Sequence, residues 1–277
     1  MKYIILFKLG ICILLIGGAV QAQEENWTQE EWNNVELKTK HVAENIYMVL
    51  GLWHGNSTIS VGQDGILLID DQFAPLAGKL TETITDISPK NIKYVINTHS
   101  HTDHIGGNAK LSKLGATVIA HEKVREDMKN DHENFMMNTP SSPDGLPTIT
   151  YKKRLNLYFN NEEVQIIHIS NAHTDNDSII YFKGSNVIHM GDIYFTSGLP
   201  YIDADIGGDI DGMIKAVEIA LTISNEQTKV IAGHGPISDS KGLKQYLIML
   251  ETSRSIINDA KMKGKSLLDI QNKPNFF

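Results

Sequence analysis

Short apolar runs alternate with amphipathic stretches between residues 46 and 129. Short apolar runs bounded by turn residues are typical of buried strands, and a period of about 3.6 residues is typical of a helix. The order of these elements favours a mostly parallel sheet with helical crossovers. The predicted strands are 46–50, 57–61, 66–69, 94–97 and 117–120, and the predicted helices are 76–87, 108–114 and 122–129.

The pattern changes after residue 130. Residues 131–147 contain three prolines, two adjacent serines and Gly145, and predict a long surface loop. Strands then follow strands until helices return near the end of the chain. Two facing sheets with helices outside is the simplest packing of this order, as one domain over 41–277. The predicted strands are 149–151, 155–159, 164–169, 178–182, 187–190 and 230–232, and the predicted helices are 210–223 and 241–261.

The first 22 residues have the features of a secretory signal peptide. Lys2 and Lys8 supply positive charge, residues 9–20 are apolar, and Val20-Gln21-Ala22 is a small-x-small cleavage site. The apolar run is shorter than the roughly 20 residues that a spanning helix needs. We therefore expect cleavage after Ala22, no stable membrane association afterwards and a secreted, periplasmic protein. Residues 23–40 are expected to form a polar N-terminal arm.

Charge and cysteine content narrow the classes of partner and ligand. Lys and Arg number 25 against 33 Asp and Glu, a formal net charge of −8. An acidic surface disfavours nucleic acid and anionic membranes as partners and leaves a small-molecule substrate. Cys12, the only cysteine, lies inside the predicted signal peptide. The mature chain would therefore have no disulfide and no thiolate ligand.

One heptapeptide, Thr98-His99-Ser100-His101-Thr102-Asp103-His104, concentrates metal-binding side chains. It follows the predicted strand 94–97, and open α/β sheets place their sites at the carboxyl ends of strands. His99 and His101 are two residues apart, so in an extended segment both leave the same side. Asp103 and His104 lie farther on and can aim at a second point. Imidazole and carboxylate bind borderline divalent metals, so this spacing favours two metals side by side.

Three further polar residues follow predicted strands. His173 comes after 164–169, Asp192 after 187–190, and His234 after 230–232. His234 stands between Gly233 and Gly235, and glycine lets the backbone approach other groups closely. Because each polar group follows the end of a strand, all three can converge on one edge of the sheets.

The series His99-x-His101-x-Asp103-His104, His173, Asp192 and His234 resembles the motif series of the metallo-β-lactamase superfamily. Asp70, at the end of the predicted strand 66–69, matches the first motif of that family. The resemblance runs in order from about residue 46 to residue 236. It implies an α/β fold, the four-layer αββα sandwich, with metals at the edge between the two halves.

The resemblance also implies a ligand set and a cofactor. By position, His99, His101 and His173 would hold one metal, Asp103, His104 and His234 a second, with Asp192 bridging them and Asp70 orienting the metal loop. The implied cofactor is two Zn²⁺ ions, with iron or manganese as alternatives. Together with a bridging water, these groups give each zinc about five ligands and leave a position open for substrate, as catalytic zinc requires.

The implied activity is that of a zinc-dependent metallo-hydrolase. A hydroxide shared by the two metals would attack a small ester, lactone or amide, possible β-lactams included, and Asp103 would orient it or pass a proton. Thioester hydrolysis, as in glyoxalase II, and phosphodiester hydrolysis are alternatives. The non-enzymatic alternative is a metal-binding protein without turnover. β-Lactamases with a cysteine ligand place that cysteine where this chain has Asp192 and carry a lysine soon after it, whereas Ile193-Tyr194-Phe195 follows here.

Some residues near the expected site have less defined roles. Trp53 and residues 135–137 are candidate lips of the substrate pocket, and Tyr194 and Tyr201 are candidate donors to an oxyanion, with core packing as the alternative in each case. His54 is expected to be a surface histidine. His121, His168 and His189 are expected to be core or edge histidines. Asp203, Asp205 and Asp209 form a charged loop without an assigned role, except that Asp205 or Asp209 can cap the following helix.

Overall fold

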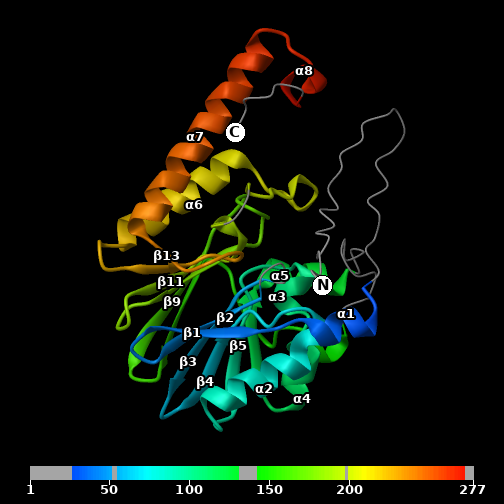
Figure 1. Ribbon diagram of the computed structural model, residues 1–277, viewed down its shortest axis with the longest axis vertical. Coiled ribbons are helices and arrows are strands. Elements are labelled where there is room, and N and C mark those ends of the chain that lie inside the picture. The colour runs from blue at the N-terminus through cyan, green and yellow to red at the C-terminus, as the bar shows by residue number, and fades with distance from the viewer. Residues whose placement is uncertain (1–26, 52–54, 131–141, 197–198, 272–277) are drawn as a thin grey trace, which may run out of the picture.

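The computed structural model describes residues 27–51, 55–130, 142–196 and 199–271. Two β-sheets face each other at the centre, and helices cover the outer face of each sheet (Figure 1). This arrangement confirms the predicted four-layer αββα sandwich. The predicted signal peptide, residues 1–22, lies outside the described residues, as do Trp53, His54 and residues 131–141.

The first sheet has the strand order β1-β2-β3-β4-β5-β6-β7. Pairs from β1 to β4 are antiparallel and pairs from β4 to β7 are parallel, so the prediction of a mostly parallel sheet is wrong for its first half. β1 was not predicted, because most of its residues are exposed and give no apolar pattern. It also crosses residue 40, so the predicted boundary between the N-terminal arm and the domain is wrong. The strands are β1 (Lys38–Ala43), β2 (Ile46–Leu50), β3 (Ser57–Gly62), β4 (Gly65–Ile69), β5 (Ile92–Ile96), β6 (Thr117–His121) and β7 (Ile149–Tyr151).

The second sheet has the order β13-β12-β11-β10-β9-β8. Only β11 and β12 pair in parallel among the strands described for this sheet. Its strands match the prediction closely, apart from the two-residue edge strand β13. They are β8 (Arg154–Phe159), β9 (Glu162–His168), β10 (Ser178–Phe182), β11 (Val187–His189), β12 (Lys229–Ile231) and β13 (Ser238–Asp239).

The helices also agree with the prediction, with additions at the site and at the two ends. The α-helices are α1 (Gln29–Asn34), α2 (Ala77–Ile87), α3 (Thr102–Ile105), α4 (Asn108–Lys113), α5 (Glu122–Lys129), α6 (Ile210–Ile223), α7 (Ser240–Met262) and α8 (Leu267–Gln271). Short 3-10 turns are η1 (Ala74–Leu76), η2 (Pro143–Gly145), η3 (Gly191–Ile193) and η4 (Ala204–Ile206). Among the helices described, none is both long and apolar enough to cross a membrane.

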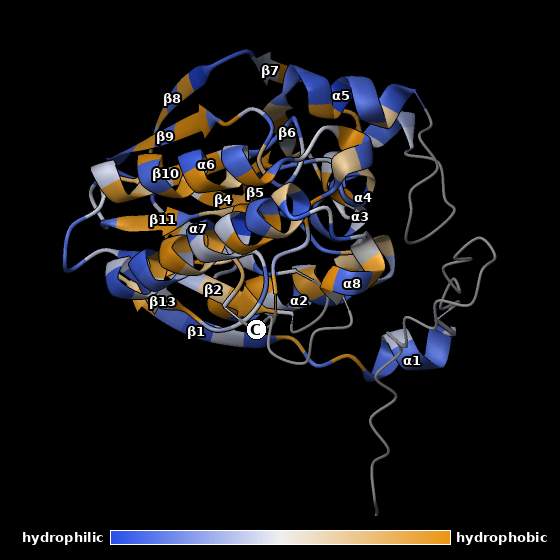
Figure 2. Cartoon of the chain, turned by 90° about the horizontal axis from the view of Figure 1, so that it is seen from above, coloured by the Kyte–Doolittle hydropathy of each residue, from blue (hydrophilic) through white to orange (hydrophobic). Residues whose placement is uncertain are grey.

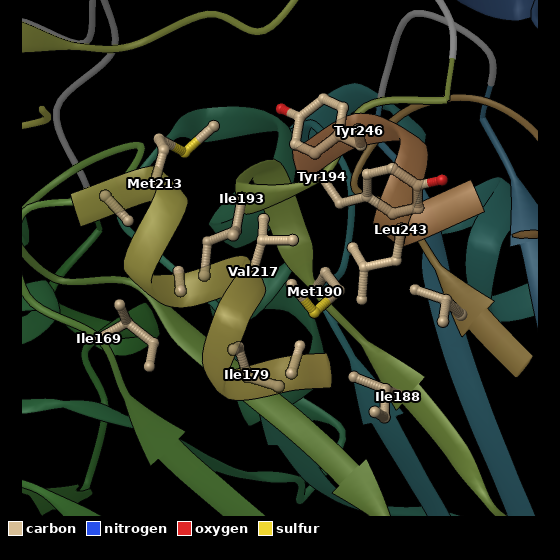
Figure 3. Close-up of a cluster of buried hydrophobic side chains, with 14 of the residues drawn as sticks. Ile169, Ile179, Ile188, Met190, Ile193, Tyr194, Met213, Val217, Leu243 and Tyr246 are labelled. Carbon is tan, nitrogen blue, oxygen red and sulfur yellow. The ribbon is translucent and has the colours of Figure 1, made fainter. Parts of the chain in front are cut away.

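Alternation along the strands separates the three largest apolar cores. In β4, Leu67 and Ile69 pack between the two sheets, while Ile66 and Leu68 pack toward α2 and α4. Successive side chains of a strand point to opposite faces, so a strand buried on both faces is apolar throughout. A third core lies between the second sheet and helices α6 and α7 (Figure 3). Helix α5 is largely hydrophilic (Figure 2), whereas α7 also exposes Ile248, Ile257 and Met262.

Two stacked histidines join the sheets where β6 and β9 end. The rings of His121 and His168 lie 3.6 Å apart at an angle of 9°. His121 Nε2 donates to the Lys152 carbonyl, and His168 Nδ1 to the Asp177 carbonyl, both at 2.9 Å. The prediction of core or edge histidines is confirmed for both. Burial and the neighbouring His121 lower the pKa of His168 to about 4, and burial also lowers the pKa of His121. The charged groups around the pair are Glu122, Lys123 and Asp175.

We expect this pair to reduce stability as the pH falls. The pKa of His168 is about 4 in the fold and about 6.5 in an unfolded chain, so the unfolded state binds more protons between these values. The free energy of unfolding should therefore decrease from about pH 6.5 toward pH 4. Because His168 is only half-buried, solvent limits the loss to on the order of 1 kcal/mol.

Denaturant unfolding of the metal-free protein at about pH 7.5 and about pH 5 measures this effect. H168F keeps a stacked ring without a titrating group and should lose this part of the pH dependence. The matched control is H41F, because His41 is exposed, and it should behave as the wild type does. An identical pH dependence in H168F and wild type would contradict the assignment.

Candidate metal centre

The structure brings all seven predicted ligands together at one edge of the two sheets. They form two groups, and within each group the ligand atoms lie within 4.8 Å of one another. The first group is His99, His101, His173 and Asp192, and the second is Asp103, His104 and His234.

Both sheets contribute to the site. His99 follows β5 of the first sheet, and His101 immediately precedes α3, which holds Asp103 and His104. The short helix α3 was not predicted, because its polar residues give no apolar period. The turn of α3 separates Asp103 and His104 from His99 and His101. This agrees with the prediction that the two pairs aim at different points. The second sheet supplies His173 between β9 and β10, Asp192 in η3 after β11, and His234 after β12.

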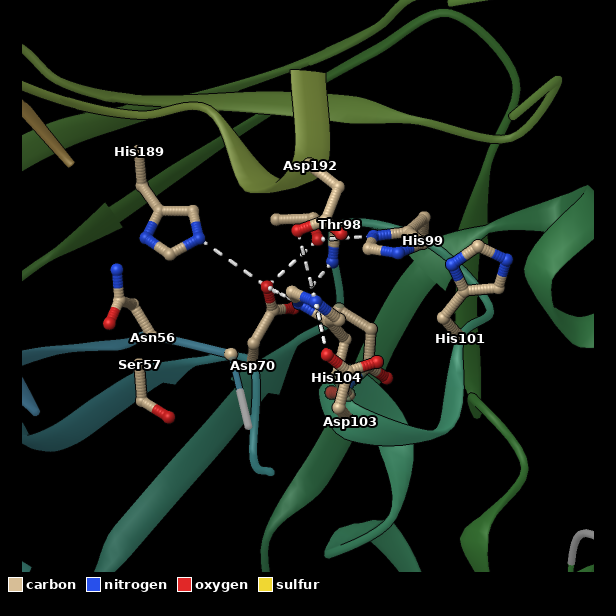
Figure 4. Close-up of polar contacts among 12 residues, drawn as sticks. Asn56, Ser57, Asp70, Thr98, His99, His101, Asp103, His104, His189 and Asp192 are labelled. Atoms are coloured by element: carbon tan, nitrogen blue, oxygen red, sulfur yellow. Dashed lines mark hydrogen bonds and ion pairs between the residues drawn. The ribbon is translucent and has the colours of Figure 1, made fainter. Parts of the chain in front are cut away.

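Asp70 orients the loop that carries the histidines (Figure 4). Its carboxylate accepts from Thr98 N at 2.7 Å, from Thr98 Oγ1 at 2.8 Å and from His104 Nδ1 at 2.7 Å. His189 Nε2 lies 3.3 Å from the same carboxylate, and its Nδ1 lies 2.8 Å from Thr58 Oγ1. Asp70 thus has the orienting position that the family resemblance implied. His189 is a core histidine, as predicted, and it also belongs to this polar network.

In three of the histidines, a hydrogen bond on one ring nitrogen directs the other nitrogen into the site. Thr98 Oγ1 donates to Asp70, so it accepts from His99 Nδ1 at 3.0 Å and leaves His99 Nε2 free. His104 Nδ1 bonds Asp70, which leaves its Nε2 free. His173 Nδ1 donates to the Tyr201 carbonyl at 2.9 Å. A committed donor on one side is the usual arrangement of a metal-binding imidazole.

Two ring nitrogens and one carboxylate oxygen of the site have no hydrogen-bond partner. His99 Nε2, His104 Nε2 and Asp192 Oδ1 are buried and have no hydrogen-bond partner. His101 Nδ1 lies 2.9 Å from His173 Nε2. Buried polar atoms are normally paired, so unpaired atoms within these two groups indicate a ligand. The donor set of imidazoles and carboxylates fits divalent metal ions.

Asp192 lies between the two groups. Its Oδ1 is 3.2 Å from His104 Nε2, and its Oδ2 is 3.3 Å from His234 Nε2 and 3.7 Å from His173 Nε2. Glycine is needed beside it, because a Cβ on Gly233 would lie 1.9 Å from Asp192 Oδ1. The close backbone approach expected next to His234 is therefore confirmed.

Without a metal, two protonated histidines neutralise the two carboxylates of the site. Burial alone would raise the pKa of Asp103 and Asp192, but His104 and His234 outweigh it and hold both pKa values well below the usual range. The same carboxylates outweigh burial at His104 and raise its pKa well above normal, and they raise the pKa of His234 to about 10. Burial lowers the pKa of His99 instead. Metal binding would displace the protons on His104 and His234.

Aromatic rings line one side of the site. Phe195 stacks on His234 with centroids 5.5 Å apart and an angle of 4°. Tyr201 is 47% exposed, and its ring centroid lies 5.7 Å from that of His173. Tyr194 is buried and its hydroxyl lies 2.8 Å from Ser238 Oγ, so its core-packing alternative is the correct one. Of the two candidate tyrosines, Tyr201 is therefore the exposed one.

Besides His189, the contacts of Thr98 and Asp203 at the site were not identified from the sequence. Thr98 connects Asp70 to His99, and Asp203 Oδ2 lies 2.9 Å from His101 Nε2. This hydrogen bond lowers the pKa of Asp203. Thr98 belongs to the motif and its position could have indicated it, whereas Asp203 has no sequence signal because it reaches His101 only through the fold. Asp209, and not Asp205, caps the N-terminus of α6, which decides between the two predicted caps.

Comparisons with known proteins agree with this geometry. A family model described as the metallo-beta-lactamase superfamily matches residues 50–234. A metallo-beta-lactamase type 2 from Bacillus cereus is 23% identical over 271 residues, which cover 89% of this chain and 98% of the relative. A hydroxyacylglutathione hydrolase from Pelagibacter ubique is 29% identical over 153 residues, 53% of this chain and 54% of the relative. The solved structure of a metallo-beta-lactamase from Pontibacter korlensis is similar in fold, with a TM-score of 0.65 at 17% identity, covering 78% of this chain and 99% of that one.

Proposed function

Because the chain belongs to the metallo-beta-lactamase superfamily, we propose that it is an exported dinuclear zinc hydrolase acting on a small ester, lactone or amide. Membership of this superfamily makes it a metallo-hydrolase with a His/Asp metal-binding cluster. The number of metals, their identity and the substrate class are the finer parts of the proposal.

The position of Asp192 between two groups of ligands carries the proposal of two metals. One carboxylate oxygen faces His104, and the other faces His234 and His173. A single ion would leave one of the two groups unsatisfied. Zinc suits five imidazoles and two carboxylates with a position open for substrate, and iron or manganese are the alternatives that metal analysis decides.

Asp103 is proposed to act both as a ligand and in catalysis. Its Oδ2 lies 3.2 Å from His234 Nε2 and 3.3 Å from His104 Nε2, which places this oxygen in the second group. Its other oxygen can orient the attacking water and accept its proton. When bound, the metal ions supply Lewis acidity, which brings the pKa of water toward neutrality and polarises the bond to be cleaved.

The walls of the site favour a substrate with an apolar part near the reacting bond. Phe195 and Tyr201 present aromatic rings beside His234 and His173. The sequence Ile193-Tyr194-Phe195 after the bridging carboxylate has no lysine for a substrate carboxylate. These features support a neutral ester, lactone or amide as the substrate. They do not favour a β-lactam that carries a carboxylate.

Thioester hydrolysis is the second candidate, and one relative supports it. That relative is named as a hydroxyacylglutathione hydrolase, and an aspartate at position 192, which would bridge two bound metals, is also consistent with that branch of the superfamily. Phosphodiester hydrolysis remains the other enzymatic alternative. Export is supported by the charged and apolar pattern of residues 1–22.

Turnover of a substrate panel by the purified mature protein tests the proposal. The panel contains a chromogenic cephalosporin, a homoserine lactone, an aryl ester, a glutathione thioester and a bis-aryl phosphate, each with and without chelator. Metal analysis of the same sample should give two zinc ions per chain. Chelator-sensitive turnover of the lactone or ester supports the proposal, and turnover of the thioester or phosphate alone moves it to that class. Two bound zinc ions with no turnover would favour a metal-binding protein without catalysis.

A further inference from the structure

The loop between η3 and α6 carries a buried carboxylate at the edge of the metal centre. Asp203 is 6% exposed, and its Oδ2 lies 2.9 Å from His101 Nε2. Its Oδ1 accepts from the amides of Asp205 at 3.1 Å and Ile206 at 3.3 Å. The two oxygens therefore have separate partners, one in its own loop and one in the site.

The backbone of Asp203 fixes the carboxylate relative to the other histidine of the group. Asp203 N donates to the His173 carbonyl at 2.9 Å, and Gly208 N donates to the Asp203 carbonyl at 2.7 Å. His173 Nδ1 donates to the Tyr201 carbonyl in the same loop. One loop thus holds both imidazoles whose free nitrogens, His101 Nδ1 and His173 Nε2, lie 2.9 Å apart.

His101 is the most exposed of the three histidines in its group, and its outer nitrogen is held by the Asp203 side chain. His99 and His173 are fully buried, whereas the side chain of His101 is 19% exposed. His101 also offers Nδ1 to the site, so its Nε2 points outward and needs a partner. A carboxylate accepts only, so the ring proton belongs on Nε2 and the lone pair on Nδ1.

We propose that Asp203 is a positioning residue that holds His101 with its Nδ1 free and so completes the three-histidine side of the metal centre. This inference rests on the proposed function to the extent that a metal binds there. It concerns metal affinity, which is measured independently of any substrate.

The geometry makes an unusual prediction for the isosteric variant D203N. Its amide oxygen should keep the place of Oδ1 against the amides of Asp205 and Ile206. The amide NH₂ then faces His101 Nε2 and donates to it, which moves the ring proton to Nδ1, the atom that must bind metal. The same change at the Asp–His pair of serine proteases keeps the geometry and removes activity through the wrong tautomer.

Competition with a chromophoric chelator measures zinc affinity in wild type, D203N, D203A and the control D205N. Asp205 lies in the same loop and is exposed. We expect both Asp203 variants to bind one of the two zinc ions about 10–100-fold more weakly, with the other ion and D205N unchanged. Cobalt substitution should show the same selective loss in the absorption spectrum of one site.

The outcomes separate positioning from a purely structural role and from the proposed function. Wild-type affinity in D203N, with or without a lowered unfolding midpoint of the metal-free protein, would overturn the inference. Two tight sites in the wild type, one weakened in D203N, and no turnover of any substrate would keep the inference and remove the proposed catalysis. A wild type that binds no metal would overturn both.

Discussion

Replacing Asp103 with alanine is expected to lower turnover of the substrate identified in the panel by at least about 10³-fold. The side chain is 3% exposed and lies within 3.3 Å of the imidazoles of His104 and His234. Its removal takes away a ligand of the second group together with the oxygen that can accept the proton of the attacking water. Metal analysis should show a loss confined to one ion, because the first group of ligands is intact.

The matched control for D103A is D144A. Asp144 is an exposed aspartate paired with Lys113 on the surface, away from the ligands, and its removal should leave turnover unchanged. Circular dichroism and the unfolding midpoint establish that D103A is folded. Turnover within a few fold of wild type in a folded D103A would contradict the role given to this carboxylate.

Replacing Asp70 with alanine is expected to lower the free energy of unfolding of the metal-free protein by about 3–5 kcal/mol. The carboxylate is 1% exposed and accepts from Thr98 N, Thr98 Oγ1 and His104 Nδ1. Its removal leaves buried donors unpaired, and the pKa of His104 is raised partly by this charge. Denaturant unfolding at neutral pH with chelator measures the loss.

Two further variants separate the carboxylate from other causes. Asp70 has a φ of +57°, a region that alanine tolerates less well than aspartate or asparagine. D70N keeps the backbone preference and should still lose most of the stability if the charge and its hydrogen bonds are responsible. D64A is the exposed control: Asp64 accepts from Asn160 N at 2.7 Å, and its removal should cost about 1 kcal/mol. Equal losses in D70A and D64A would contradict the explanation.

The fold was predictable where apolar periodicity and burial coincide. β2, α5 and α6 have the bounds expected from their patterns, because each buries an apolar face that the sequence displays. β1 was missed because an exposed edge strand with Lys38 and Lys40 gives no alternation. The antiparallel half of the first sheet was misjudged because pairing direction depends on connections and not on the strands themselves.

The seven ligands of the candidate site were predictable, because they match the motif series of the metallo-β-lactamase superfamily. Seven residues from distant parts of the chain were placed by strand ends and by resemblance, and the fold brings them together. Asp203 and His189 were not foreseen as parts of the site, because a single aspartate or histidine near a strand end is common. Their positions follow from tertiary contacts with His101 and Asp70, which no local pattern encodes.

The contribution of both sheets to one set of ligands has a consequence for when the protein acquires its metal. His99 comes from the first sheet and His234 from the second, so neither group of ligands exists until both halves have folded and docked. An unfolded chain has only the isolated His99–His104 segment and should hold metal weakly. The metal would therefore come from whichever compartment the chain folds in, and the supply there would decide which ion the folded protein contains.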